Sequence, residues 1–160
     1  MINFTNHNKK LKIENAVLND VPELCGLLTI LFTQEEEFRP DFQKQAAGLN
    51  KIILTPEAGC ILKASADGKI IGMVNLLFTI STYTGGRVAI LEDMVVLPEY
   101  RGGGTGAKML QAAKDKAAQE GCTRITLLTD GSNTGAQKFY KKHSFEKSDM
   151  VAMRYDAEAH

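Results

Sequence analysis

The feature that most constrains the fold is a strand, a glycine-rich loop and a helix that follow one another within residues 90–110. Residues 90–97 are mostly apolar and end at Pro98, which cannot continue a central ladder, so they predict a buried strand. From Lys108 the apolar residues recur at helical spacing. Glycines between these elements let a ligand approach the amides that begin the helix. The sequence therefore predicts a site for phosphate or another anion, beside the fixed charge of Arg101.

Three phosphate-binding patterns can be compared with this loop. A P-loop requires lysine directly after its last glycine, and here Ala107 intervenes. A dinucleotide-binding fingerprint requires its glycines directly after the strand, and residues 98–101 intervene. The third pattern is Arg/Gln-x-x-Gly-x-Gly/Ala, which Arg101, Gly104 and Gly106 satisfy.

Composition narrows the class of protein. A chain of 160 residues with 44% hydrophobic and 24% charged residues is typical of one ordinary globular domain. The 19 basic and 19 acidic residues give no charge excess that would favour nucleic acid or an anionic membrane as partner. There is no membrane-spanning apolar run and no export signal, so we expect a cytoplasmic protein. Three widely spaced cysteines predict free thiols, and no residues have the spacing of metal ligands.

Apolar periodicity and turn signals predict the order of elements: a strand, two helices, three antiparallel strands, a helix, a strand, a helix and a final strand. The Asp67-Gly68 pair predicts a tight hairpin. We therefore expect a single α+β domain over residues 1–160, with a mixed, mostly antiparallel sheet of six to seven strands and about four helices. Residues 1–10 are expected to form a loose N-terminal arm or a weak edge strand. The expected strands are 11–17, 59–66, 70–82, 90–97, 124–128 and 151–155 with Phe145.

The second half of the chain resembles the GNAT superfamily of N-acetyltransferases in two motifs that occur in the right order. The first runs from Val96 through Arg101 to Gly106, and the second runs from Asn133 to Phe145. The family often has glycine before the last phenylalanine, where this chain has Ser144. The resemblance implies a GNAT-like sheet with a splayed central strand pair. It also implies acetyl-CoA as the acetyl donor cosubstrate, with no metal.

The resemblance also implies which residues bind acetyl-CoA. The glycine loop would cradle the pyrophosphate, the backbone of Val96 would bond to the pantetheine arm, and the Met94 amide would act as an oxyanion donor. Asn133 would bond to pantetheine, although a plain N-cap explains it nearly as well. The expected binding residues are Met94, Val95, Val96, Arg101, Gly102, Gly103, Gly104, Thr105, Gly106, Ala107, Asn133 and Tyr140.

Acetylation of an amine requires a base, because an alkyl ammonium with a pKa near 10 is almost wholly protonated at about pH 7. Glu92 and Asp93 are carboxylates in an otherwise apolar strand, where they are costly unless they serve a function. Alternation places Glu92 on the face of Met94 and Asp93 opposite, unless a bulge resets the register. We favour Glu92 as the base, directly or through water, and Asp93 as an amine anchor or a structural residue. The alternative is that both carboxylates only bond to neighbouring loops. Tyr140 would protonate the departing thiolate, with a core-capping tyrosine as the alternative.

Substrate recognition is expected in the connection between the first two helices, where aromatic residues flank an acidic run. A solvated helix end explains the run about as well. The expected substrate-binding residues are Phe32, Glu35, Phe38 and Asp93, with Glu36, Glu37 and Arg39 beside them. The predicted reaction is acetyl transfer to a primary amine of a small molecule or peptide by direct attack in a ternary complex. The alternative is a non-catalytic acyl-CoA-binding module. The oligomeric state stays open, with a homodimer among the possibilities.

Overall fold

The computed structural model describes residues 10–35 and 39–159, which form two compact units. The first unit extends to Leu128, and the second spans Thr129–His160. The strands of the first unit are β1 (Lys12–Asn15), β2 (Gly59–Ala66), β3 (Lys69–Ser81), β4 (Gly86–Val96) and β5 (Ile125–Leu127). Its α-helices are α1 (Val21–Gln34), α2 (Phe42–Leu54) and α3 (Thr105–Gln119). The second unit contains α4 (Thr134–Lys142). Short 3₁₀ turns occur at Leu18–Asp20, Pro98–Tyr100 and Ala157–Ala159.

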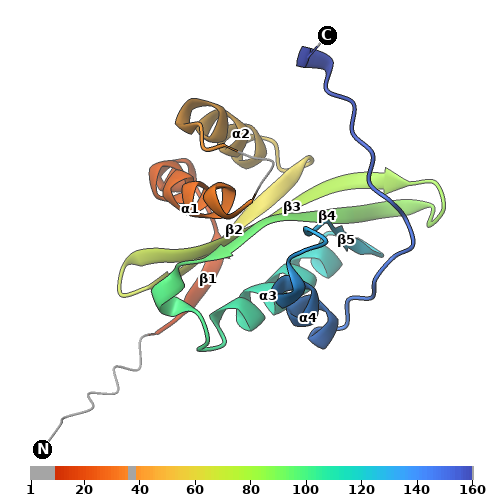
Figure 1. The fold of residues 1–160 in the computed structure, drawn as a ribbon. Coiled ribbons are helices and arrows are strands. Elements are labelled where there is room, and N and C mark those ends of the chain that lie inside the picture. Colours follow the sequence, from red (N-terminus) through yellow and green to blue (C-terminus); the bar gives the residue numbers. More distant parts are fainter. Residues whose placement is uncertain (1–9, 36–38, 160) are drawn as a thin grey trace, which may run out of the picture. The chain divides into compact units, whose positions relative to one another are not determined.

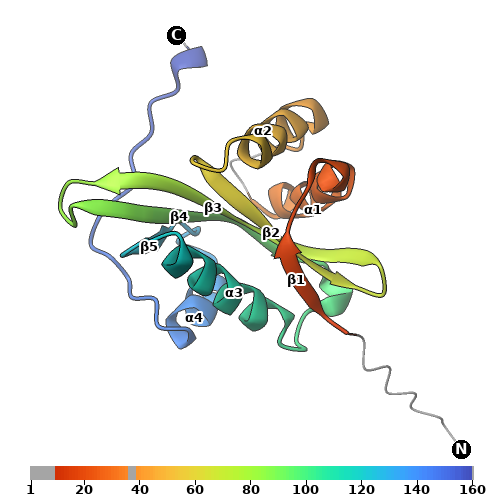
Figure 2. The same ribbon diagram turned by 180° about the vertical axis from the view of Figure 1, so that it is seen from behind.

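The sheet of the first unit has the strand order β1-β2-β3-β4-β5. The first four strands pair antiparallel, and β5 lies parallel to β4 after the crossover through α3. Helices α1 and α2 cover one face of this sheet and α3 covers the other (Figures 1 and 2). The hairpin between β2 and β3 turns at Asp67 and Gly68, whose φ angles of 52° and 78° are those of the predicted tight turn.

The core lies on both faces of the sheet. On the side of α1, a cluster of buried side chains joins Leu24 and Leu28 to Met73 of β3 and Val95 of β4. On the other side, Gly72 lets α3 approach the sheet, since a Cβ at this position would lie 2.7 Å from the sulfur of Met109. Adjacent residues of β3 therefore face opposite helix layers, as strand alternation requires.

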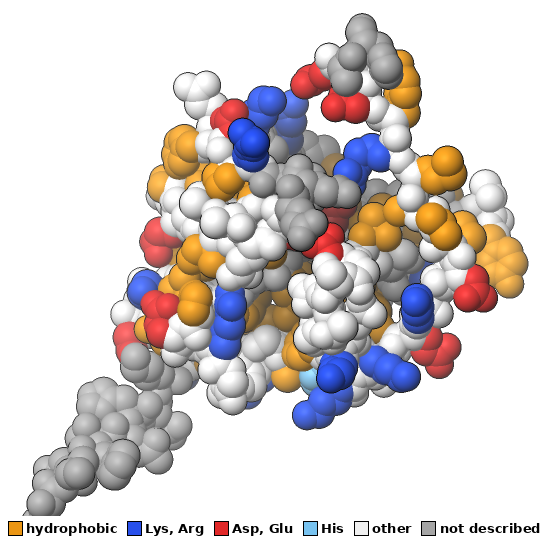
Figure 3. All heavy atoms as spheres, in the orientation of Figure 1, with side chains coloured by type: hydrophobic (Ala, Val, Ile, Leu, Met, Phe, Trp, Pro, Cys, Tyr) orange, Lys and Arg blue, Asp and Glu red, His pale blue; other side chains and the backbone are white. Residues whose placement is uncertain are grey.

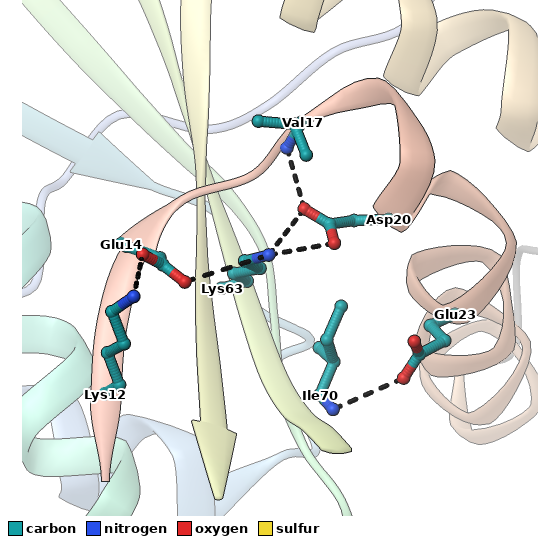
Figure 4. Close-up of polar contacts among 7 residues, drawn as sticks. All are labelled: Lys12, Glu14, Val17, Asp20, Glu23, Lys63 and Ile70. Carbon is teal, nitrogen blue, oxygen red and sulfur yellow. Dashed lines mark hydrogen bonds and ion pairs between the residues drawn. The ribbon is translucent and has the colours of Figure 1, made fainter. Parts of the chain in front are cut away.

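A polar network holds the start of α1 against the β2–β3 hairpin (Figure 4). The Lys63 ammonium lies 2.7 Å from Asp20 Oδ2, and both side chains are only 13% exposed. The same carboxylate accepts a hydrogen bond from the amide of Val17. Glu23 of α1 accepts a hydrogen bond from the amide of Ile70, the second residue of β3. These contacts orient α1 over the sheet.

The strand count differs from the prediction, because the described residues form a sheet of five strands rather than six or seven. Residues 151–155, which were expected to close the sheet, form no strand, and neither does Phe145. Their alternation favours β-structure, but a strand forms only where a neighbouring backbone accepts and donates its hydrogen bonds. The predicted arm over residues 1–10 falls almost wholly outside the described residues. The assignment of residues 1–160 to one domain stays a prediction.

The surface carries both signs of charge. Acidic and basic side chains both lie on the face seen in Figure 3, as equal numbers of each would suggest. Among the described helices, none is long and apolar enough to span a membrane.

Candidate active site

A β-bulge interrupts the middle of β4. Met73 pairs with Val95 and Asn75 pairs with Glu92, so β4 advances three residues while β3 advances two. Asp93 lies in this interval with φ of 51°, a left-handed conformation that L-residues other than glycine rarely adopt. The alternation expected along a regular strand therefore does not hold between Glu92 and Asp93.

The bulge brings the Asp93 carboxylate onto a side chain of the neighbouring strand. Asn75 Nδ2 donates a hydrogen bond of 2.6 Å to Asp93 Oδ2. Because Asn75 and Met73 are two residues apart on β3, both side chains point towards the layer of α1 and α2. Asp93 thus faces this layer, whereas the side chain of Glu92 is exposed.

Burial is the main cause of an unusual pKa at Asp93. Together with the negative charges of Glu92 and Glu35, it raises the pKa of Asp93 from 3.8 to about 6, and the hydrogen bond from Asn75 opposes this rise. Glu35 caps the C-terminal end of α1. Its influence on Asp93 places that end of the helix within electrostatic reach of the bulge. A carboxylate with a pKa near neutrality is suited to accept a proton at physiological pH.

Beyond the bulge, one edge of β4 has no partner strand among the described residues of the first unit. The parallel ladder joins only Ala89, Ile90 and Leu91 to β5, so the segment from Glu92 to Val96 extends past its end. At the far end of this segment, Arg101 Nε donates a hydrogen bond of 2.8 Å to the carbonyl oxygen of Val96. The expected positions of Met94, Val95 and Val96 therefore fall on this open edge.

The glycine loop follows directly and ends at α3. Gly102 and Gly104 have φ of 80° and 85°, and Gly104 is the N-cap of the helix. Lys108 N bonds to Gly104 O in the first turn, while no backbone carbonyl in the described parts of the chain accepts from an amide between Gly102 and Ala107. The loop also borders open space, since a Cβ added at Gly102, Gly103 or Gly104 would meet no atom within 4 Å.

These properties fit a diphosphate group. The amides of residues 102–107 are donors that need acceptors, and the helix macrodipole favours negative charge at the same place. Gly103 and Gly106 have no side chain, so they could offer only backbone contacts to such a cradle. Within the described residues, no group of three or more His, Cys, Asp or Glu side chains is arranged to hold a metal ion.

The second unit contains the later motif. Asn133 caps α4 by accepting a hydrogen bond of 3.0 Å from the amide of Ala136, which is the structural role considered from the sequence. Tyr140 packs edge-on against Phe139 and Phe145, with ring centroids 5.3 and 5.7 Å away, and burial raises the pKa of its hydroxyl. Ser144, at the position where the family often has glycine, adopts φ of 69°. The pantetheine role of Asn133 and the acid role of Tyr140 stay predictions.

The structure locates part of the expected substrate site. Phe32 is half-buried against the α1 cluster and Arg39 is exposed. Glu36, Glu37 and Phe38 lie outside the described residues. The residue that the sequence analysis missed is Asn75, and the available signal was a single amide side chain within the apolar run from Ile70 to Phe78.

Comparisons with known proteins identify the family of this chain. The model of the Acetyltransferase (GNAT) family matches residues 22–145. The uncharacterized N-acetyltransferase YhfO of Bacillus subtilis is 37% identical over 140 residues, which cover 86% of this chain and 91% of that protein. Aminoalkylphosphonate N-acetyltransferase of Salmonella typhimurium is 25% identical over 137 residues, 86% of each chain. A predicted acetyltransferase from Clostridium acetobutylicum, solved with acetyl-CoA, superposes with a TM-score of 0.78 at 20% identity, covering 94% of this chain and 99% of that one. With the family match spanning most of its length, this chain is an acyltransferase that belongs to the acetyltransferase (GNAT) family.

Proposed function

We propose that this enzyme transfers the acetyl group of acetyl-CoA to a primary amine by direct attack in a ternary complex. The observation that carries the proposal is the open edge of β4, which connects the glycine loop at one end to the carboxylates of the bulge at the other. A thioester held along this edge would have its diphosphate at the loop and its acetyl group near the bulge. Membership of an acyltransferase family favours this enzyme over a non-catalytic acyl-CoA-binding module.

The loop and the β4 edge are the proposed binding surface for acetyl-CoA, which supplies an activated acetyl group when bound. The amides of residues 102–107 would bind the diphosphate, with Arg101 adding positive charge. Val96 does not exchange ladder hydrogen bonds with β3, so its backbone would bond to the pantetheine arm. Asn133 and Tyr140 belong to the proposed set on the basis of the sequence motif that contains them.

Amine activation is assigned to the carboxylates of the bulge. An alkyl ammonium must lose a proton before its nitrogen can attack, which costs roughly 4 kcal/mol at about pH 7 for a pKa near 10. Asp93 and Glu92 are the proposed acceptors of that proton. Asp93 is held in the bulge with a pKa of about 6, and Glu92 is exposed beside it.

In the transfer itself the amine nitrogen forms a bond to the carbonyl carbon and the carbon–sulfur bond breaks. The Met94 N–H would donate to the developing oxyanion, and Tyr140 would give its hydroxyl proton to the sulfur. The nitrogen loses two protons in all, one before and one after attack. One proton replaces that of Tyr140 and the other passes to solvent.

The charges around the bulge support a cationic acceptor. Glu35, Glu92 and Asp93 are close enough for their charges to interact, and such a group attracts an ammonium ion. Phe32, one turn before Glu35 on α1, would supply an apolar contact. The Salmonella relative is named for an aminoalkylphosphonate, whose amino group is the kind of acceptor proposed here.

Release of free thiol from acetyl-CoA across a panel of amines tests the proposal. The panel should include polyamines, amino sugars, amino acids, aminoalkylphosphonates and peptide N-termini. Amine-dependent thiol release with a matching acetylated product is expected for at least one class. If the protein binds acetyl-CoA but no amine accelerates thiol release above the rate in buffer, an amine acceptor is excluded.

A further inference from the structure

Asn75 is a polar residue at a buried position, where its side chain lowers the stability of the fold. Its side chain is 1% exposed, and its β3 neighbours Val74 and Leu76 are fully buried apolar residues. Its Oδ1 atom is buried and finds no hydrogen-bond partner among the described residues. An amide oxygen left without a partner in the core is unfavourable, so an apolar side chain would suit a purely structural role better. The compensating contact is the 2.6 Å hydrogen bond from Nδ2 to Asp93.

The orientation of this amide follows from the charge of its partner. An ionised carboxylate only accepts hydrogen bonds, so the nitrogen of Asn75 must face Asp93 while Asp93 is charged. The bond engages Oδ2, and the described residues make no second hydrogen bond or ion pair to this carboxylate, which leaves Oδ1 to accept a proton. The left-handed backbone of Asp93 and this bond together hold the carboxylate in one place.

We infer that Asn75 is a positioning residue that holds the carboxylate of Asp93 so that Asp93, rather than Glu92, takes the proton from the acceptor amine. This inference rests on the proposed function. The N–H bond of the ammonium breaks, the proton passes to Asp93 Oδ1, and the electron pair stays on nitrogen to attack the thioester carbon. Glu92 is exposed and contributes negative charge that favours a cationic substrate.

The negative charges near Asp93 explain why a carboxylate that acts as a base here needs a hydrogen-bond donor to keep it ionised. Glu92 lies beside it on β4 and Glu35 lies at the end of α1, and both disfavour its ionised form, as does burial. Asn75 of β3 opposes these three effects and lowers the pKa of Asp93. Without this donor, more Asp93 would be protonated at neutral pH and unable to accept a proton.

The test replaces Asn75 with leucine, which has a similar volume and no donor, and uses Asn75→Val if the leucine variant does not fold. Met73→Leu is the matched control, since it changes a fully buried residue on the same face of the same strand. The rate constant kcat/KM for the amine is measured between about pH 5 and pH 9. Loss of the donor should move the acid limb of the profile up by about one pH unit, so that kcat/KM falls roughly fivefold near pH 6, approaches a tenfold loss near pH 5 and recovers above about pH 8. The control should keep the wild-type limb.

A second measurement needs no catalysis. Carbon-13 NMR titration of the Asp93 carboxyl should show a higher pKa in the Asn75 variant than in wild type, and an equal pKa would refute the positioning role. Asp93→Asn should lower kcat by about 10²- to 10⁴-fold and Glu92→Gln by much less. The reverse ranking would make Glu92 the base. Should wild type acetylate no amine at any pH, the proposed function fails, while the NMR titration still decides whether Asn75 controls Asp93.

Discussion

Arg101 Nε donates a hydrogen bond to the carbonyl oxygen of Val96, five positions earlier in the chain, at a distance of 2.8 Å. The bond ties the beginning of the glycine loop to the last residue of β4. It also uses one donor of a guanidinium that has five, so the charge and the remaining donors stay available at the mouth of the loop. Arg101 therefore has a structural contact and a proposed ligand contact at once.

Gly104→Asp should abolish measurable binding of acetyl-CoA. Gly104 has φ of 85° at the N-cap of α3, where a carboxylate would be strained and would repel the diphosphate. The helix should still form, because aspartate is a common N-cap. Arg101→Ala should weaken binding only about tenfold, since the loop amides remain.

Isothermal titration calorimetry of the folded variants with acetyl-CoA measures both effects. Gly48→Asp introduces the same charge at an exposed position of α2 and is the control. An unchanged affinity in folded Gly104→Asp would remove the diphosphate from the glycine loop.

Tyr140→Phe should lower kcat by about 10²- to 10⁴-fold and leave the KM for acetyl-CoA nearly unchanged. The substitution removes the proposed proton donor to sulfur and keeps the packing against Phe139 and Phe145. Its defect should not recover at high pH, whereas that of Asp93→Asn should shrink as more amine arrives deprotonated.

Steady-state kinetics across the pH range separate the two variants, and Tyr83→Phe, at an exposed hairpin position, is the control. Full activity of Tyr140→Phe would show that the tyrosine has no part in the chemistry.

Glu35→Gln should change the site in the opposite direction from Asn75→Leu. Removal of its negative charge lowers the pKa of Asp93, so the acid limb of kcat/KM should move to lower pH. The KM for a cationic amine should rise, because one attracting charge is lost, and the KM for acetyl-CoA should not change. Glu57→Gln neutralises an exposed residue outside the site and is the control. If the pH profile of kcat/KM and the KM for the amine are both unchanged, Glu35 is only a solvated residue at the end of the helix.

Asp93→Asn should stabilise the protein at neutral pH although it removes the proposed base. The folded pKa of about 6 lies above the ordinary value of 3.8, so between these values the folded state binds more protons than the unfolded state. Stability contributed by this group is therefore greatest below pH 3.8 and falls as pH rises to about 6. Above about pH 6, the ionised Asp93 destabilises the folded state by roughly 3 kcal/mol, at about 1.36 kcal/mol per pKa unit, and solvent screening reduces this figure.

Thermal unfolding of both proteins at acidic and neutral pH measures this effect. The gain in Tm of Asp93→Asn over wild type should be larger at about pH 7.5 than at about pH 4.5. A gain that is the same at both pH values would contradict the raised pKa of Asp93.

Some elements of the fold form because of residues within or next to them, and the sequence alone was enough to predict these elements. The strand, glycine loop and helix over residues 90–110 form as predicted because proline, glycine and helical spacing act within a few residues. The limits of β2 and the turn at Asp67 and Gly68 follow from the same short-range chemistry. The cap at Asn133 also depends only on residues that follow it directly.

The tertiary structure decided which strands pair and which distant side chains come into contact. Residues 151–155 have a strand-like pattern but form no ladder, because a ladder needs a partner that their own sequence does not supply. The sequence could not predict that a bulge forms at Asp93, because the extra residue in β4 is defined by the register of β4 against β3. Asn75 lies 18 positions from Asp93, and only the pairing of two antiparallel strands brings its amide to the carboxylate. The sequence alone therefore determined where the proposed anion site and the two carboxylates lie along the chain, while the fold decided which carboxylate is partly buried and held, because burial and hydrogen bonding depend on distant residues.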